Sequence, residues 1–280
     1  MIQLLLERGA DPNSQDDGAT ALHKAILAGQ QLAAAALVEG GTKHAVETAV
    51  AFGDLALVDA FVRERGANAV TLEEMTLLHW AAAGGQRDAV GALLGLGADV
   101  ATKAREERTA IYFAAQAGDP ATIRLLVDAG AIVNPPPNED GEVLAAPLAV
   151  AAQRGHQAAV EVLLELAADA RAGGEYGRTA LHCASDGGNL EVVNALLGAG
   201  ADANATCGGV MEAVGGSNTI TGVYRVTPLH FAAGGGHVEV VSRLLAAGAN
   251  KSATDNFDRT PRDWALKHGH TETAAALLGD

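Results

Sequence analysis

One short pattern recurs along this chain and limits its fold more than any other feature. Each copy holds a T-x-L-H-like tetrad, an Ala-rich stretch, a glycine, a V-x-x-L-L stripe and a closing Gly-Ala-Asp-x-Asn. The two clearest copies span residues 179–204 and 227–250. Self-similarity of this kind is the signature of repeats that are too small to bury a core alone and must stack on their neighbours. We therefore expect a linear array of small units rather than one thick globular core.

Further copies extend the array over nearly the whole chain, which gives about eight units after an N-terminal half-unit at residues 1–13. Hydrophobic residues make up 49% of the sequence but aromatic residues only 4%, a balance that suits thin layers of closely packed helices. The additional copies begin at Thr20, Thr76, Thr109, Ala146 and Thr260, and a worn copy begins at His44.

Each part of the unit has a physical role that predicts two short helices. Threonine is a good N-cap, and the Pro or Ala that follows it suits the first helical position. The glycine after the Ala-rich stretch, such as Gly188, stops the first helix in a left-handed conformation. In the second helix, the spacing of Val192, Val193, Leu196 and Leu197 makes one apolar stripe that faces the stack.

These units resemble the ankyrin repeat, with its period of about 33 residues and its T-P-L-H-x-A signature. The resemblance implies an all-α fold, an ankyrin-repeat solenoid of stacked helix-turn-helix units with projecting loops. It covers residues 1–280 as one ankyrin-repeat domain. By the same resemblance, the chain is a protein–protein interaction module or scaffold that binds a partner on its concave face of loops and first helices.

Two regions depart from the regular unit. Residues 205–226 form an insert about fifteen residues longer than the usual turn, and its Gly-Gly pairs flank apolar segments. This pattern favours a hairpin or a mobile finger over another helix. Residues 251–280 place polar Arg262, Asp263 and Lys267 where apolar residues are usual, so we interpret them as a C-terminal capping unit. Because Met1 falls inside an expected second helix, the sequence could be part of a longer protein.

The charge balance excludes some partners. The chain has 34 Asp and Glu against 19 Lys and Arg, a formal net charge of -15. An acidic chain has too few cations to neutralise the phosphates of nucleic acid or to bind an anionic membrane, so neither is an expected partner. No apolar run approaches the roughly 18 to 20 residues of a membrane span. The two cysteines form no paired framework, so we expect a protein of a reducing compartment, the cytoplasm, with the nucleus as a further location.

No catalytic, cofactor or metal site is predicted. Most of the nine histidines recur at structural positions, in the tetrad or after the turn glycine, and lack the spacing of metal ligands. Cys183 follows a tetrad and is expected to be buried. Cys207 lies on the insert, where it could be exposed and reactive, but no basic residue adjoins it in sequence to activate the thiol. The chain is therefore not expected to be an enzyme.

The predicted contact residues are polar, charged or aromatic positions that vary between copies, although many could be merely solvated turn residues. The expected partner is another protein, and the chain is expected to be a monomer. Two alternatives remain open: a regulatory or targeting fragment of a larger protein such as a kinase, ubiquitin-ligase adaptor or channel, and an enzyme that uses the insert. The predicted contact residues are Arg105, Glu106, Arg108, Gln116, Gln153, Arg154, Glu175, Tyr176, Arg178, Asp186, Tyr224, Arg225, Asn256, Phe257, Arg259 and Lys267.

Three of these arginines occupy the same place before a capping threonine, at Arg108, Arg178 and Arg259. Stacking would bring equivalent places into a row, and Arg154 and Arg225 could extend it. Such a stripe could steer an acidic partner even though the net charge is negative. The alternative is that these arginines pair with nearby acids, namely Glu106, Glu107, Glu175 and Asp258.

Overall fold

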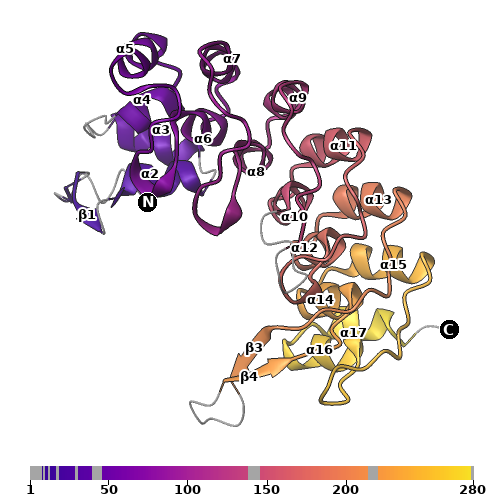
Figure 1. The fold of residues 1–280 in the computed structure, drawn as a ribbon. Coiled ribbons are helices and arrows are strands. Elements are labelled where there is room, and N and C mark those ends of the chain that lie inside the picture. The colour runs from indigo at the N-terminus through magenta and orange to yellow at the C-terminus, as the bar shows by residue number, and fades with distance from the viewer. Residues whose placement is uncertain are drawn as a thin grey trace. The chain divides into compact units, whose positions relative to one another are not determined.

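The computed structural model describes residues 8, 10–11, 13–16, 19–28, 31–39, 46–137, 146–213 and 220–278. The chain divides into two compact units, Met1–Val133 (unit 1) and Asn134–Asp280 (unit 2). Both are built from short helices (Figure 1). Most of the predicted half-unit at residues 1–13 and the start of the worn copy at His44 lie outside the described residues.

Unit 1 stacks its helices in two layers. The first helices of successive repeats, α4, α6 and α8, pack side by side, and the second helices α5, α7 and α9 form the other layer. Two short strands pair before the first described helix, and single 3-10 turns precede α6 and α8. The elements are β1 (Gln15–Asp16), β2 (Ala19–Thr20), α2 (Ala21–Leu27), α3 (Gln31–Glu39), α4 (Val46–Ala51), α5 (Leu55–Arg65), η1 (Leu72–Glu74), α6 (Leu77–Ala83), α7 (Arg87–Gly95), η2 (Arg105–Glu107), α8 (Ala110–Ala117) and α9 (Pro120–Asp128).

Unit 2 repeats the same two layers. Helices α10, α12, α14 and α16 pack in one row and α11, α13, α15 and α17 in the other. A β-hairpin interrupts the regular order between α13 and α14. The elements are α10 (Pro147–Gln153), α11 (Gln157–Glu165), η3 (Glu175–Gly177), α12 (Ala180–Asp186), α13 (Leu190–Gly198), β3 (Val210–Ala213), β4 (Ile220–Val223), α14 (Pro228–Gly234), α15 (Val238–Ala246), α16 (Pro261–Lys267) and α17 (Thr271–Ala276).

The tetrad begins the first helix, as predicted. At the start of α6, Thr76 and His79 form a capping box, in which each residue bonds to the backbone of the other. The backbone N–H of Thr76 donates to Nδ1 of His79 at 3.0 Å, and the threonine side chain caps the backbone of the same histidine. This arrangement satisfies backbone donors that a helix start leaves without partners. The same box forms at Thr20 with His23, Thr179 with His182 and Thr227 with His230.

The tetrad histidine also joins one repeat to the next. Because Nδ1 accepts from a backbone N–H, the ring proton lies on Nε2, where it can be donated to a carbonyl. In unit 1, His79 Nε2 donates to the Thr102 carbonyl at 3.0 Å. In unit 2, the Nε2 atoms of His182 and His230 donate to the carbonyls of Val226 and Arg259, each at 3.1 Å. The recurrence of these histidines is therefore structural, which confirms that part of the prediction.

Burial holds these rings neutral. It lowers the pKa of His79 and of His182 to about 4, and it lowers the pKa of His23 and His230 in the same direction. Desolvation penalises the charged imidazolium. For His79, His182 and His230 the hydrogen bonds from Nε2 to a carbonyl only partly offset this effect, and for His23 the nearby Glu47 and Glu73 do so. The neutral tautomer is the one that can bridge two repeats.

Apolar residues of the second helices form the core between layers. Val192, Val193 and Leu196 are almost fully buried, whereas Leu197 is only half-buried. The Ala-rich stretch of the first helix is buried as well, since its small side chains let neighbouring helices approach closely. Gly188, with φ 68, ends the first helix in the left-handed region, as predicted.

The insert at residues 205–226 contains the predicted hairpin. Strands β3 and β4 pair antiparallel, with Val210 opposite Val223 and Ala213 opposite Ile220. They extend away from the helices of unit 2 (Figure 1). At their base, Cys207 and Val226 exchange backbone hydrogen bonds of 2.9 and 3.0 Å. Residues 214–219, which join the strands, lie outside the described residues.

The last repeat changes the box. Its N3 residue is Asp263, whose Oδ2 accepts from the Thr260 N–H at 2.8 Å and from its Oγ1 at 2.6 Å. These hydrogen bonds from Thr260 lower the pKa of Asp263. An ionised carboxylate closes the box but, unlike histidine, has no proton to donate to a carbonyl. That residues 251–280 act as a capping unit stays a prediction.

Candidate binding surface at the loop tips

A loop leads into α6, α8, α12, α14 and α16, and its tip is defined here as the residue three places before the capping threonine; at α14 the loop follows directly after β4. Backbone hydrogen bonds close the loop independently of the tip side chain. Ala104 donates to the Arg108 carbonyl and Gly174 to the Arg178 carbonyl, both at 2.8 Å. The tip position holds Glu73 and Glu106 in unit 1 and Tyr176, Tyr224 and Phe257 in unit 2.

The tips of unit 1 carry charges that pair locally. Arg105 reaches from one loop to the other, with its Nη1 at 3.1 Å from Glu73 Oε2 and its Nε at 3.5 Å from Glu74 Oε1. Arg108 pairs with Glu106 of the same loop. Because most of these side chains are exposed, such pairs contribute little to stability, but they give these tips a mixed-charge surface.

The tips of unit 2 are aromatic and exposed. Tyr176 is 55% exposed, Tyr224 52% and Phe257 44%. Glycines back both tyrosine rings, since a Cβ at Gly209 would clash with the ring of Tyr176 and a Cβ at Gly208 would clash with that of Tyr224. Each ring therefore rests on backbone, which limits its motion while one face stays open to solvent. Aromatic side chains held in this way lose little entropy on binding.

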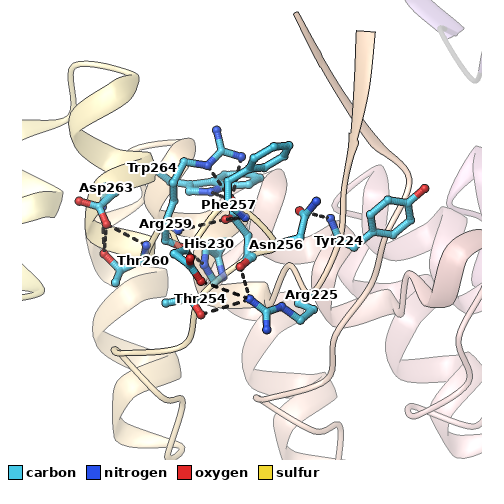
Figure 2. A network of polar contacts seen from close by, with 12 residues as sticks. Tyr224, Arg225, His230, Thr254, Asn256, Phe257, Arg259, Thr260, Asp263 and Trp264 are labelled. Atoms are coloured by element: carbon cyan, nitrogen blue, oxygen red, sulfur yellow. Dashed lines mark hydrogen bonds and ion pairs between the residues drawn. The ribbon is translucent and has the colours of Figure 1, made fainter. Parts of the chain in front are cut away.

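The Tyr224 and Phe257 loops are joined by hydrogen bonds, as Figure 2 shows in part. The Tyr224 N–H donates to Asn256 Oδ1 at 2.8 Å, and the Asn256 N–H donates to the Tyr224 carbonyl at 3.1 Å. Arg225 Nη2 donates to the carbonyl of Asp255 and lies 3.4 Å from Thr254 Oγ1. These contacts fix the two adjacent tips relative to each other.

A buried carboxylate organises the Phe257 loop. Asp255 is fully buried, and its side chain accepts from the Phe257 N–H at 2.8 Å and from the Arg259 Nε at 2.8 Å. Trp264 Nε1 donates to the same carboxylate at 2.9 Å. Burial alone would raise the pKa of Asp255, but the hydrogen bonds from Trp264, Arg259 and Phe257 lower it below its usual range. The loop is thus held by an ionised group.

The role of Asp255 was not predicted from the sequence, although a comparison of the repeat copies could have indicated it. Trp264 lies four residues after its capping threonine and Asp255 five residues before it. In unit 1, Trp80 and Thr71 hold the same two places, and Trp80 Nε1 donates to Thr71 Oγ1 at 3.0 Å. A tryptophan in the first place therefore predicts an acceptor in the second.

The three equivalent arginines are paired with acids, which favours the alternative to a positive stripe. Arg108 pairs with Glu106, as that alternative proposed. The partners of the other two differ from those expected, because Arg178 bonds to Asp186 at 2.7 Å and Arg259 to Asp255 at 2.7 Å. Their guanidinium groups also cover aromatic rings, listed with their distances to the ring centroid: Arg108 over Tyr112 at 5.1 Å, Arg178 over Phe231 at 4.8 Å, and Arg259 over Phe257 at 5.0 Å and Trp264 at 5.6 Å.

Most other predicted contact residues are accessible. Gln153, Arg154, Asp186 and Lys267 are exposed, and the side chain of Glu175 lies outside the described part of the chain. The prediction for Gln116 is wrong, because it lies in the core of α8 with only 8% of its surface exposed. The helical period turns this position inward, where it cannot contact a partner without a rearrangement.

Cys207 also differs from its prediction as an exposed thiol. It is 4% exposed and belongs to an apolar cluster with Val223, Val226, Phe231 and Trp264. Burial raises its pKa to about 11, since desolvation outweighs the influence of nearby Arg178. The hairpin base seals this residue into the core, so a reactive thiolate is not available. Cys183 is buried, as predicted.

The loops hold charged residues in left-handed backbone. Two residues before the capping threonine, φ is 59 at Glu74, 61 at Glu107, 60 at Arg225 and 57 at Asp258. Before α12 this place holds a glycine, Gly177, with φ 78. A non-glycine residue in this region costs roughly 1 kcal/mol.

Among the described residues, no cluster of three or more His, Cys, Asp or Glu side chains could hold a metal ion. No described helix has both the length and the apolar content that crossing a membrane requires.

Comparisons with known proteins agree with the repeat geometry. A family model described as "Ankyrin repeats (3 copies)" matches residues 46–137, 137–207 and 212–280, and one described as "Ankyrin repeats (many copies)" matches residues 1–37. The crystal structure of the human ASB11 ankyrin repeat domain superposes with a TM-score of 0.67 at 25% identity, covering 85% of this chain and 99% of that one.

Curated relatives that match part of the chain include a channel homologue, a bacterial protein and a ubiquitin ligase. A Caenorhabditis elegans homologue of the transient receptor potential cation channel subfamily A member 1 is 31% identical over 147 residues, 52% of this chain and 12% of that protein. Protein PhlB of Serratia liquefaciens is 34% identical over 152 residues, 52% of this chain and 63% of that protein. The E3 ubiquitin-protein ligase KEG of Arabidopsis thaliana is 30% identical over 211 residues, 66% of this chain and 13% of that protein.

Proposed function

Because this chain belongs to the ankyrin-repeat family, whose repeats are protein-interaction modules, we propose that unit 2 binds a partner protein through its aromatic loop tips. The anchors are Tyr176, Tyr224 and Phe257. Arg225, Asn256 and Asp186 supply polar contacts around them. The chain binds without turning over a substrate.

The observation that carries this proposal is the exposure of three aromatic side chains at one position of three consecutive repeats. Burying such a side chain in an interface releases roughly 25 cal/mol per Å2 of apolar surface. Tyrosine and tryptophan are enriched among the residues that contribute most to protein interfaces. The glycine backing of Tyr176 and Tyr224 prepares both rings for contact.

Affinity capture with the intact chain, followed by mass spectrometry, tests the proposal. Tyr176→Asn, Tyr224→Ser and Phe257→Ser should each weaken retention of the captured partner, and asparagine tolerates the left-handed backbone of residue 176. Leu278→Ser is the matched control, because Leu278 is 64% exposed and follows α17, which belongs to the row of second helices in unit 2. Equal retention by all four variants would remove the tips from the binding site.

A second candidate is that the chain serves as the regulatory or targeting part of a larger protein. Two of its relatives, a channel homologue and a ubiquitin ligase, are far longer than the segment that matches this chain. That segment makes up 12% of the channel homologue and 13% of the ligase. The mass of the endogenous protein tests this idea. A product of 28.3 kDa, the mass of this sequence alone, would contradict it. A monomeric state and a reducing, cytoplasmic compartment also stay predictions.

A further inference from the structure

Tyr176 and Tyr224 lie against the same short stretch of backbone, although they come from different loops. A Cβ at Gly209 would fall 2.3 Å from Cδ2 of Tyr176, and a Cβ at Gly208 would fall 2.4 Å from Cδ1 of Tyr224. The Gly208 N–H also donates to the Tyr176 carbonyl at 2.8 Å, which holds the Tyr176 loop at this segment. Because the two glycines are consecutive, the two exposed rings and these glycines form one surface, the tyrosine platform.

This fold repeatedly places its own arginines over aromatic rings. The guanidinium of Arg178 lies 4.8 Å from the centroid of the Phe231 ring, and that of Arg259 lies 5.0 Å from the centroid of Phe257. Such contacts are favourable because the face of an aromatic ring is negative and attracts a cation. Among the described residues, no arginine or lysine covers the ring of Tyr224. Figure 2 shows this ring turned away from the Arg259 guanidinium.

Carboxylates offset the positive charge of the arginines in the three tip loops of unit 2. The pairs, with their distances, are Arg178 with Asp186 at 2.7 Å, Arg225 with Asp258 at 3.8 Å and Arg259 with Asp255 at 2.7 Å. Of these acids, Asp258 has a side chain that is 93% exposed. The formal net charge of the chain is -15, so the long-range field that a partner meets favours a cation.

We propose that the partner docks a basic segment on the tyrosine platform and places arginine side chains over the rings of Tyr176 and Tyr224. This inference rests on the proposed function and specifies the chemistry of the partner. A guanidinium is flat and more weakly hydrated than an ammonium, so it stacks on an aromatic face more readily. The exposed carboxylate of Asp258 lies in the loop that bonds to Tyr224, where it can pair with a further arginine.

Labelled peptides of equal length, which alternate glycine with arginine, lysine, citrulline or glutamate, supply the probes. Each is titrated against the intact chain at low and at high salt. Citrulline has the flat shape of arginine without its charge, so it separates charge from shape. The arginine peptide should bind about threefold or more tighter than the lysine peptide, and the citrulline and glutamate peptides should bind more weakly still. High salt should weaken binding of the arginine peptide.

The rings are tested by replacing Tyr176 and Tyr224 together. The double leucine variant keeps apolar side chains but loses both aromatic faces, so it should bind the arginine peptide about tenfold more weakly. The double phenylalanine variant is the matched control, since it keeps the rings and should change affinity less than about twofold. Unchanged far-ultraviolet spectra would show that both variants keep the fold.

The charge is tested in the same way at Asp258. Asp258→Asn should weaken binding of the arginine peptide at low salt, and asparagine tolerates the left-handed backbone of this residue, where φ is 57. Glu239→Gln is the matched control, because it removes one negative charge from the exposed surface of α15, in the row of second helices. It should have the smaller effect.

Three results contradict the inference: no binding of the arginine peptide, equal affinities for the arginine and citrulline peptides, or full affinity in the double leucine variant. The partner obtained by affinity capture separates this inference from the proposed function. If Tyr176→Asn and Tyr224→Ser abolish retention of that partner while the double leucine variant keeps it, the tips bind through apolar contact and a basic segment is wrong. If none of these changes affects retention, the proposed function fails as well.

Discussion

The loop tips of the two units occupy the same place before the capping threonine but differ in chemistry. Glu73 and Glu106 occupy the position in unit 1 that Tyr176, Tyr224 and Phe257 occupy in unit 2. Backbone hydrogen bonds close loops in both units, and in both units a tetrad histidine donates to a carbonyl of the next repeat. The tip side chain is therefore free to vary without loss of the fold. On the proposed function, the repeats separate stability, which the buried tetrad and stripe provide, from recognition, which we assign to the tips.

The largest loss of stability is expected from changes in the buried apolar stripe of the second helices, and it should be similar in the two units. Leu93→Ala in unit 1 and Leu196→Ala in unit 2 should each cost about 2 to 5 kcal/mol, since both side chains are fully buried between helices. Denaturant unfolding followed by circular dichroism measures this cost. A negligible cost in one unit would show that its layers are not packed as described.

Lowering the pH should also reduce the unfolding free energy of both units. The pKa of His79 and of His182 lies near 4 in the folded chain against 6.5 when exposed, so the unfolded chain takes up protons first as pH falls. The stability that these histidines contribute is complete above about pH 6.5 and is lost progressively toward pH 4. At pH 5.5 each should have lost about 1 kcal/mol.

Unfolding free energies measured between pH 7.5 and 4.5 test this dependence. His79→Gln and His182→Gln should each flatten the curve while lowering stability at pH 7. A curve that keeps its full slope in the double variant would show that other groups take up the protons.

A smaller effect, of opposite sign in the two units, is expected from the left-handed loop position. Glu107→Gly in unit 1 should raise stability by about 0.5 to 1 kcal/mol, because glycine adopts φ 61 without strain. Gly177→Ala in unit 2 should lower it by a similar amount, since φ is 78 there. Melting temperatures of the two variants provide the comparison, and shifts of the same sign would contradict it.

The smallest effect is expected from the exposed charges of unit 1. Arg105→Ala removes the pairs with Glu73 and Glu74 but should change the unfolding free energy by less than about 1 kcal/mol. Repeating the measurement at high salt should reduce even this difference. A larger, salt-independent loss would mean that the charged tips hold unit 1 together.

Much of this fold could be predicted from the sequence because the repeat encodes local structure. The threonine caps, the left-handed glycines and the hairpin in the insert follow from patterns within a few residues of one another. Contacts between distant segments could not be predicted in this way. Cys207 is buried because the hairpin base pairs it with Val226 and places it against Phe231, and no local pattern reports that packing.

The positions of the candidate site could be predicted from the sequence, but the pairing of its arginines with carboxylates could not. Arg178 and Arg259 are followed by threonine and look exposed in sequence, yet each bonds to a carboxylate and covers an aromatic ring. Those partners lie eight and four residues away along the chain, on the other side of a helix start or a turn. The aromatic tips remained accessible, and so the chemistry of the predicted surface shifts from basic to aromatic.

Exchanging the tips between the two units tests whether the aromatic tips of unit 2 bind the partner. The triple variant Tyr176→Glu, Tyr224→Glu and Phe257→Glu gives unit 2 the tip chemistry of unit 1. Glutamate already occupies the left-handed conformation of residue 176 at Glu73 and Glu106, each with φ 58. The control, Glu73→Tyr with Glu106→Tyr, changes unit 1 alone. Affinity for the captured partner should be lost in the triple variant and kept in the control, with both melting temperatures close to that of the parent chain. Full affinity in a folded triple variant would contradict the assignment of binding to the aromatic tips of unit 2.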